Sequence, residues 1–238
     1  RVRLLHISDL HRAGRTETLR AIWQGPHSAL RKLPESEQRF DLIVVSGDLA
    51  GAALPAEYDE LHEFACGSLL PLLRDPDDRA RIIFVPGNHD VDWQAQIGDP
   101  LRLTELLDQP GGAERLAMLL QRYRDDPARS QVRQAISKYG HIEWLLLDEA
   151  CHNARFANVQ TFLHEFYAGC LRDPHRAFDL QADYEGADWS AHLFLADRIA
   201  VYGFNSCFLN DRYWMGAAIS RESIANAAAH ANEHAEGC

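Results

Sequence analysis

The chain has 238 residues, 46% of them hydrophobic and 25% charged, which are the proportions of an ordinary globular protein. It carries 24 Lys and Arg against 35 Asp and Glu, a formal net charge of −11 with neutral histidines. Stable binding to duplex nucleic acid needs a dense basic surface, so this composition argues against such a role.

Three short apolar runs alternate with two segments of helical spacing in the first 90 residues. The runs 2–7, 42–45 and 81–85 predict buried strands, and segments 16–33 and 57–73 predict the helices between them. Strand, helix, strand, helix, strand is the pattern of a parallel sheet with right-handed crossovers. We therefore expect the α/β class.

The pattern changes after this region. Residues 100–186 predict mainly helices, segments 191–196 and 199–204 predict a hairpin returning to the sheet, and 220–236 predict a terminal helix. We expect one domain, 1–238, with a core formed by 1–98 and 187–238 and a mainly helical insertion at about 99–186. Phe156, Phe162, Phe166 and Tyr167 have helical spacing within this insertion, which is typical of core residues.

Each of the three expected strands ends in residues of metal-ligand type. They are Asp9 and His11 after the first strand, Asp48 after the second, and Asn88, His89 and Asp90 after the third. Parallel strands end at one edge of a sheet, where open α/β sheets bind their ligands. The sequence therefore predicts that these side chains share one crevice.

The residue types suit a centre of two divalent cations. Carboxylate with imidazole favours Mn, Fe or Zn over Ca. Asp48 can bridge two cations roughly 3.5–4 Å apart, and Asn88 can offer a neutral carbonyl oxygen. His89 is a candidate to stabilise charge on the substrate or to protonate the leaving oxygen.

Asp-Leu-His at 9–11, Gly-Asp at 47–48 and Gly-Asn-His-Asp at 87–90 resemble, in order and spacing, the first three motifs of the calcineurin-like metallophosphoesterase family. The resemblance implies that fold, central sheets flanked by helices. It also implies two divalent metal ions held by Asp9, His11, Asp48 and Asn88, a catalytic His89, and attack on phosphorus by a metal-activated water. Leu49-Ala-Gly follows Asp48 in place of Asp-Arg-Gly, and Gly203-Phe-Asn-Ser also resembles the phosphodiesterase-like branch.

The family completes its site with a downstream His and a Gly-His-x-His motif, and neither is present here. Gly140-His141 is followed by Ile142 and Glu143, so it lacks the second His. The fold is therefore expected to be incomplete at the C-terminus. The chain is a fragment, or its remainder is disordered or removed, or another chain completes the site; in each case we expect weakened metal affinity, chiefly at the second metal.

Three further residues are candidates for support or substrate contact beside Asp90. Asp92 is a candidate to support the ligands, and Asn205 to approach the site from the returning strand. Trp93 fits either a lid that stacks on a base or simple packing.

The sequence favours a metal-dependent hydrolase that acts on phosphodiesters, provided that the missing C-terminal histidine motifs are supplied, with a phosphate ester such as a nucleotide as its partner. Two alternatives stay open: a non-catalytic sensor or regulatory module on the same fold, and a nuclease. The nuclease would need basic residues beside the site, for which the candidates are Arg115, Arg122, Arg124, Arg129 and Arg133.

Cysteine usage and hydropathy bear on the cellular compartment. The five cysteines form no CxxC pair and are odd in number, which favours a reducing compartment. The sequence has no apolar run of membrane-spanning length and opens without a signal-peptide pattern, so we expect a cytoplasmic location and no membrane partner.

Overall fold

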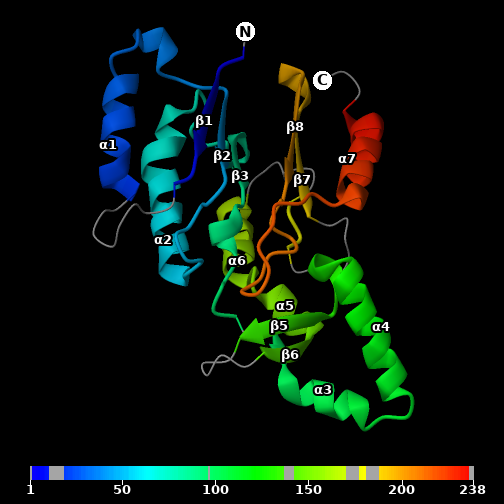
Figure 1. Ribbon diagram of the computed structural model, residues 1–238. Coiled ribbons are helices and arrows are strands. Elements are labelled where there is room, and N and C mark those ends of the chain that lie inside the picture. Colours follow the sequence, from blue (N-terminus) through cyan, green and yellow to red (C-terminus); the bar gives the residue numbers. More distant parts are fainter. Residues whose placement is uncertain are drawn as a thin grey trace.

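The computed structural model describes residues 2–10, 19–95, 97–136, 142–169, 177–180 and 188–235. Within these ranges the strands form a parallel three-stranded sheet, an antiparallel three-stranded sheet and a two-stranded hairpin. Figure 1 shows the parallel sheet and the hairpin side by side, with the antiparallel sheet below them. None of the described helices combines the length and the apolar character that crossing a bilayer requires.

The parallel sheet has the order β1 (Leu4–Ser8), β2 (Leu42–Ser46), β3 (Ile82–Val85). Ser8 is paired with Ser46 and Ser46 with Val85, so the three strands end at one edge, as predicted. The prediction that the first strand is buried is wrong. β1 is an edge strand whose residues alternate between exposed and half-buried, and Leu4 is 50% exposed.

Helices α1 (Leu19–Leu30), α2 (Pro55–Phe64) and α6 (Ala157–Tyr167) belong to the main hydrophobic core. The Phe84 ring of β3 meets those of Phe162 and Phe166 edge to face, at centroid distances of 5.0 and 4.9 Å. The aromatic residues of α6 are therefore core residues, as predicted. They pack against the parallel sheet, although the sequence had placed them in an insertion.

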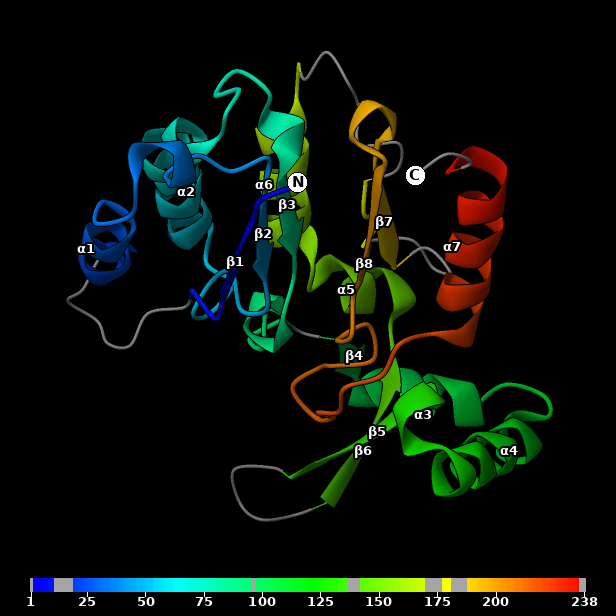
Figure 2. The same ribbon diagram turned by 90° about the horizontal axis from the view of Figure 1, so that it is seen from above.

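The predicted hairpin is present as β7 (Trp189–Phe194) and β8 (Ile199–Phe204), and its two faces pack differently. Phe194, Ile199 and Val201 pack against Leu42 and Ile83 of the parallel sheet, whereas Trp189 and Ala191 pack against Ala227 of the terminal helix. This helix, α7 (Arg221–His234), begins after Ser220, whose hydroxyl accepts a hydrogen bond from the Ser223 amide. Helices, sheet, hairpin and α7 thus follow one another as layers (Figure 2). Within the described residues the hairpin lies on a face of the parallel sheet and adds no strand to it.

The segment predicted to be mainly helical also contains a sheet. Helices α3 (Pro100–Leu107), α4 (Gly112–Asp125) and α5 (Glu149–Ala154) are accompanied by strands β4 (Gly98–Asp99), β5 (Val132–Ile136) and β6 (Ile142–Leu147). The strands form an antiparallel sheet of order β4-β6-β5, and Val132 of β5 packs with α3 and α4 in a separate small core. The insertion boundaries at about 99 and 186 stay a prediction.

His192 of β7 makes the fold sensitive to acid. Its side chain faces Tyr167 at a ring distance of 5.9 Å, is 2% exposed, and has no hydrogen-bond partner for Nδ1 among the described residues. Burial lowers its pKa from 6.5 to about 4. The unfolded chain therefore binds more protons than the folded chain between these values, so the free energy of unfolding decreases as the pH is lowered from 6.5 to 4, by up to about 3 kcal/mol.

Denaturant unfolding at pH 7, 5.5 and 4.5 measures this effect. His192→Leu should lose less stability on acidification than the unmodified chain, because it has no imidazole to charge. Parallel losses in the two proteins would show that His192 does not titrate on unfolding.

Candidate functional site

The carboxyl ends of the three parallel strands open into one pocket. Asp9 follows β1, Asp48 follows β2 and Asn88 follows β3, and all three line a cavity of about 540 Å³. Asp48 is 8% exposed and Asn88 is exposed. Three segments that are distant in sequence thus deliver three oxygen-bearing side chains to one place.

The first two of these residues lie on unusual backbone. Asp9 has a φ of 54° and Asp48 a φ of 40°, and between them in space lies Gly47 with a φ of 70°. The Asp9 amide donates to the carbonyls of Ser46 and Gly47 at 3.3 Å, and the Gly47 amide donates to the Val85 carbonyl at 2.9 Å. Non-glycine residues at positive φ store strain of about 1–3 kcal/mol and cluster at functional sites. Here the strain is held by hydrogen bonds between neighbouring strand ends.

Asp90 joins the loops that carry Asp48 and Asn88. Its carboxylate accepts hydrogen bonds from the amides of Leu49 at 2.9 Å, Ala50 at 3.0 Å and Gly87 at 2.8 Å, and from the Tyr58 hydroxyl at 2.8 Å. Asp90 is fully buried. Its carboxylate therefore fixes the two loops relative to each other from behind the pocket, and it is not among the residues that line the cavity.

Burial affects both side chains of the hydrogen bond between Tyr58 and Asp90. It raises the pKa of Asp90 to about 6, against the lowering effect of the hydrogen bonds that Asp90 accepts. The pKa of Tyr58 is also raised, by burial and then by the charge of Asp90. Tyr58 thus remains the donor, and the sequence offered no motif that would have identified it.

The predicted catalytic residue, His89, lies beside the pocket. Its amide donates to Asp48 Oδ1 at 3.0 Å, and its Nδ1 lies 2.8 Å from the Gly51 carbonyl oxygen. A carbonyl can only accept, so Nδ1 carries a proton and the ring orientation is set by Gly51. His89 is not among the residues that line the cavity. Its catalytic role stays a prediction.

The other candidates differ in where they lie. Trp93 lines the pocket. Asp92 and Asn205 do not; Asp92 Oδ1 accepts from the Gln94 amide at 2.8 Å, and Asn205 Oδ1 accepts from the Cys207 amide at 2.8 Å. Both side chains therefore shape local turns. Their involvement with the site stays a prediction.

Two sequence features lie outside the described residues: His11, the fourth predicted ligand, and the Gly140-His141 pair. Over the part of the chain that the structure describes, no group of three or more His, Cys, Asp or Glu side chains is arranged to hold a metal ion. The predicted ligands that line the pocket in these ranges are therefore two carboxylates, Asp9 and Asp48, with the amide of Asn88.

The pocket has a second wall, of which the sequence indicated only the beginning, at Asn205. It is formed by the segment after β8, residues 205–217, which contributes Ser206, Cys207, Asn210, Met215, Gly216 and Ala217. The Ala218 amide donates to the Ser206 carbonyl at 2.8 Å, so this segment closes on itself like a compact surface loop. No metal-ligand motif or periodicity marks it.

The charge of the pocket decides what it can hold. No Lys, Arg or His is among its described lining residues, whereas Asp9 and Asp48 are both carboxylates. A phosphate anion would be repelled unless cations were present, because like charges without partners are unfavourable in a recessed site. Two carboxylates with a neutral amide oxygen suit hard or borderline divalent cations, so the described residues fit such a centre.

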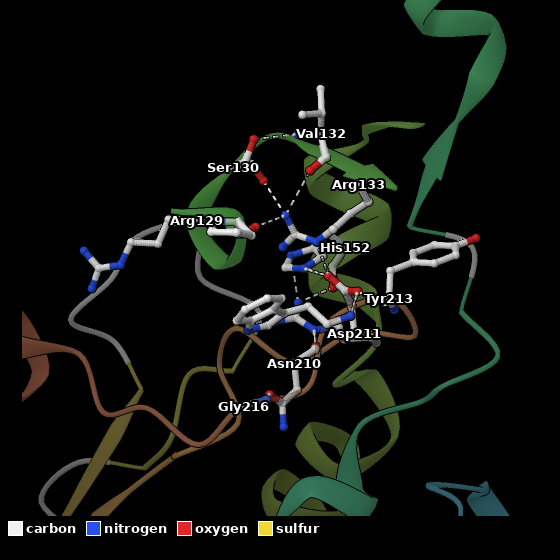
Figure 3. Close-up of polar contacts among 12 residues, drawn as sticks. Arg129, Ser130, Val132, Arg133, His152, Asn210, Asp211, Tyr213 and Gly216 are labelled. Atoms are coloured by element: carbon white, nitrogen blue, oxygen red, sulfur yellow. Dashed lines mark hydrogen bonds and ion pairs between the residues drawn. The ribbon is translucent and has the colours of Figure 1, made fainter. Parts of the chain in front are cut away.

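One arginine considered for nucleic-acid contact has a different role. Arg133 is 2% exposed, and its Nε donates to Asp211 Oδ2 at 2.9 Å (Figure 3). The Nε atom of Arg129, another candidate, lies 3.8 Å from Asp126 Oδ2. Arg133 is therefore buried within the protein and does not present a basic surface.

Comparisons with known proteins give a family match for the part of the chain that carries these residues. A family model of calcineurin-like phosphoesterases matches residues 2–130, more than half of the chain. The 3',5'-cyclic adenosine monophosphate phosphodiesterase CpdA of Escherichia coli (strain K12) is 33% identical over 93 residues, which cover 38% of this chain and 30% of that protein. CpdA of Escherichia coli O157:H7 matches equally. The match thus spans about a third of the length of these relatives.

Proposed function

This chain belongs to the calcineurin-like phosphoesterase family, and from that premise we propose that it contributes the site of a divalent-metal-dependent phosphodiesterase. The observation that carries the proposal is the shared pocket of Asp9, Asp48 and Asn88 at the ends of three parallel strands. Two divalent cations, Mn, Fe or Zn, are the cofactors we propose, with His11 as a further ligand.

The bound cations would supply the positive charge that attracts the phosphate and activates the attacking water. Asp9 and Asp48 would hold them with charged oxygens, and Asn88 with a neutral one. His89 would give a proton to the leaving oxygen. Its Nδ1 is committed to the Gly51 carbonyl, so the proton would leave from Nε2.

The charge balance favours a diester over a monoester. A diester phosphate carries one negative charge, whereas a monoester carries close to two at neutral pH. The described lining of the pocket offers no basic side chain to hold the second charge. Since the relative CpdA is named for 3',5'-cyclic adenosine monophosphate, a cyclic nucleotide is the first natural diester to test.

We propose the cytoplasm as the location, on the ground of its cysteines. Cys66 and Cys207 are free cysteines, and Cys207 lies at the pocket, where burial raises its thiol pKa to about 11. Free cysteines without a disulfide partner are typical of a reducing compartment.

The test is hydrolysis of bis(p-nitrophenyl) phosphate with and without Mn²⁺, compared with p-nitrophenyl phosphate and 3',5'-cyclic adenosine monophosphate. We expect Mn²⁺-dependent turnover of diesters above monoester, and a rise in melting temperature with Mn²⁺ because the ion binds the folded state. Binding of Mn²⁺ without turnover of any ester would favour the sensor or regulatory module. If the chain neither binds Mn²⁺ nor hydrolyses any of the esters, the phosphodiesterase and the sensor or regulatory module are both excluded.

His89→Asn separates catalysis from metal binding. Without the imidazole, turnover should fall by roughly 10²–10⁴-fold, the usual contribution of a general acid. The Mn²⁺-dependent rise in melting temperature should persist, because this substitution leaves Asp9, Asp48 and Asn88 in place. Undiminished turnover of the diester would remove His89 from the mechanism.

A further inference from the structure

The two walls of the pocket are joined through one buried residue, Arg155. This residue is 2% exposed and lies between α5 and α6. Its backbone carbonyl accepts a hydrogen bond from the Asp92 amide at 2.9 Å. Asp92 is next to Trp93, which belongs to the first wall, the part of the lining that follows the parallel strands and includes Asp9, Asp48 and Asn88. Its guanidinium donates to the second wall.

The guanidinium of Arg155 is satisfied largely by backbone carbonyls of that second wall. Nε donates to the Asn210 carbonyl at 2.6 Å, and Nη2 donates to the Phe208 carbonyl. Nη1 donates to the carbonyl of His152 and lies 3.0 Å from its Nδ1. A planar fork with five donors can span such divergent acceptors, which a lysine ammonium cannot do with the same geometry.

The surroundings keep this side chain charged and in place. Burial lowers the pKa of Arg155 to about 10, partly offset by Asp211 and Asp188, so it remains a cation at neutral pH. The guanidinium also lies over the Phe156 ring, 4.4 Å from its centroid. A buried cation with carbonyl acceptors and a ring beneath it has little freedom to move.

A second contact fixes the same wall to the small sheet. Asp211, which is 1% exposed, pairs with Arg133 of β5, and His152 Nε2 lies 3.4 Å from Asp211 Oδ2 (Figure 3). Burial alone would raise the pKa of Asp211, but His152 and Arg133 together hold it below its usual value. The other oxygen of Asp211 accepts from the amides of Tyr213 and Trp214, at 2.8 and 3.0 Å. The segment leading to Met215 is thus held at its base.

The wall that these contacts hold presents both polar side chains, Ser206 and Asn210, and apolar ones to the pocket. Met215 is 77% exposed, and with Ala217 it lines the cavity that Trp93 also lines. The charged donors Asp9 and Asp48 line the same cavity. A diester held at those donors carries two ester groups, and an ester group that meets Met215 and Trp93 gains apolar contact.

We propose that Arg155 is a positioning residue that sets the separation of the two pocket walls, so that the pocket selects phosphodiesters with a flat or apolar ester group. This rests on the proposed function, because it assumes that the phosphate lies at Asp9, Asp48 and Asn88. Arg155 itself touches no substrate.

Two phosphinates test the proposal without turnover. Diphenyl phosphinate and dimethyl phosphinate are both monoanions that resist hydrolysis, and they differ in the groups that reach the walls. Calorimetric titration with Mn²⁺ present compares the unmodified chain with Arg155→Lys, using Arg122→Lys on the exposed surface of α4 as the matched control. We expect Arg155→Lys to weaken diphenyl phosphinate about 10-fold and dimethyl phosphinate less than about twofold, the scale of one apolar contact in a pocket.

The outcomes separate the hypotheses. If Arg155 had a merely structural role, Arg155→Lys would lower the number of binding sites per chain and leave both dissociation constants unchanged. That result would overturn the proposal, and so would an equal loss of affinity for the two phosphinates. If the unmodified chain binds neither phosphinate, the proposed function fails instead.

Met215→Ala tests the same wall at an exposed position that does not disturb the buried contacts. It should weaken only diphenyl phosphinate, and an unchanged affinity would also overturn the proposal.

Discussion

Asp48→Ala should abolish Mn²⁺-dependent hydrolysis and the stabilisation that Mn²⁺ gives to the fold. Asp48 is the proposed bridge between two cations, so its removal takes a ligand from each. Even outer partners of a metal ligand change affinity or activity by about 10–100-fold, so we expect a loss of turnover of at least about 100-fold. At an Mn²⁺ concentration of about 100 times the dissociation constant, the lost stabilisation would be about 2.7 kcal/mol.

Alanine at this position also disturbs the apoprotein. Asp48 Oδ1 accepts the His89 amide hydrogen, and an unsatisfied buried donor costs about 1–3 kcal/mol. The φ of 40° adds strain for alanine, whereas aspartate and asparagine tolerate the left-handed region better. Loss of activity in Asp48→Ala alone would therefore not separate metal binding from folding.

Asp48→Asn provides that separation. The amide oxygen can still accept from the His89 amide and the backbone keeps a tolerant residue, but the bridging charge is gone. We expect unfolding without Mn²⁺ close to that of the unmodified chain, together with loss of the Mn²⁺ response and of turnover. If Asp48→Asn keeps the Mn²⁺ response and the turnover, Asp48 does not bridge metal ions and the proposed site is wrong.

The position of Asp48 could be predicted from sequence because it depends on local signals. The apolar run 42–45 reads as a strand, and a polar residue that follows a parallel strand lies at the sheet edge whatever surrounds it. The same reasoning placed Asp9 and Asn88 correctly at that edge. It could not show that β1 is exposed along one side, because an apolar run reads the same at the edge of a sheet and at its centre.

The second wall could not be predicted because its contacts are long-range. Arg155 contacts Asn210 across 55 residues, and Arg133 contacts Asp211 across 78. No periodicity connects positions so far apart. The spacing of Phe162 and Phe166 identified core residues but not which core, since that depends on where the α6 helix packs. The direction of the His89 ring likewise depends on the Gly51 carbonyl, which sequence spacing does not reveal.

Gly87→Ala should be the most damaging single-methyl substitution at the site. A Cβ on Gly87 would lie closer to the backbone nitrogen and Oδ1 of Asp48 than real Cβ contacts allow, and 2.8 Å from the Gly47 carbonyl carbon. These neighbours are mostly backbone, held by the Asp90 carboxylate, so they cannot move aside cheaply. The backbone at Gly87 is extended, with a φ of −119°, so the effect is steric and needs no backbone strain.

We expect Gly87→Ala to destabilise the fold by about 1–3 kcal/mol or more, the range found for overpacked cores, and to displace Asp48 from Asn88. Gly25→Ala is the matched control. A Cβ at Gly25, within α1, meets nothing within 4 Å apart from its chain neighbours. Pro26 follows Gly25, and a proline disfavours the helical conformation of a preceding residue that carries a Cβ, which offsets the usual preference of about 0.5–1 kcal/mol for alanine over glycine in a helix. The same added methyl group should therefore change stability little at Gly25 and destabilise the fold at Gly87.

Denaturant unfolding and Mn²⁺ titration of both variants decide the matter. Gly87→Ala should lower both the free energy of unfolding and the affinity for Mn²⁺, because the Asp48 loop must shift to make room. Gly25→Ala should change the free energy of unfolding much less and leave the affinity for Mn²⁺ unchanged. A Gly87→Ala protein with normal stability and normal Mn²⁺ affinity would mean that the two strand-end loops do not pack as closely as the Asp90 hydrogen bonds require, and the pocket of Asp9, Asp48 and Asn88 would lose its structural basis.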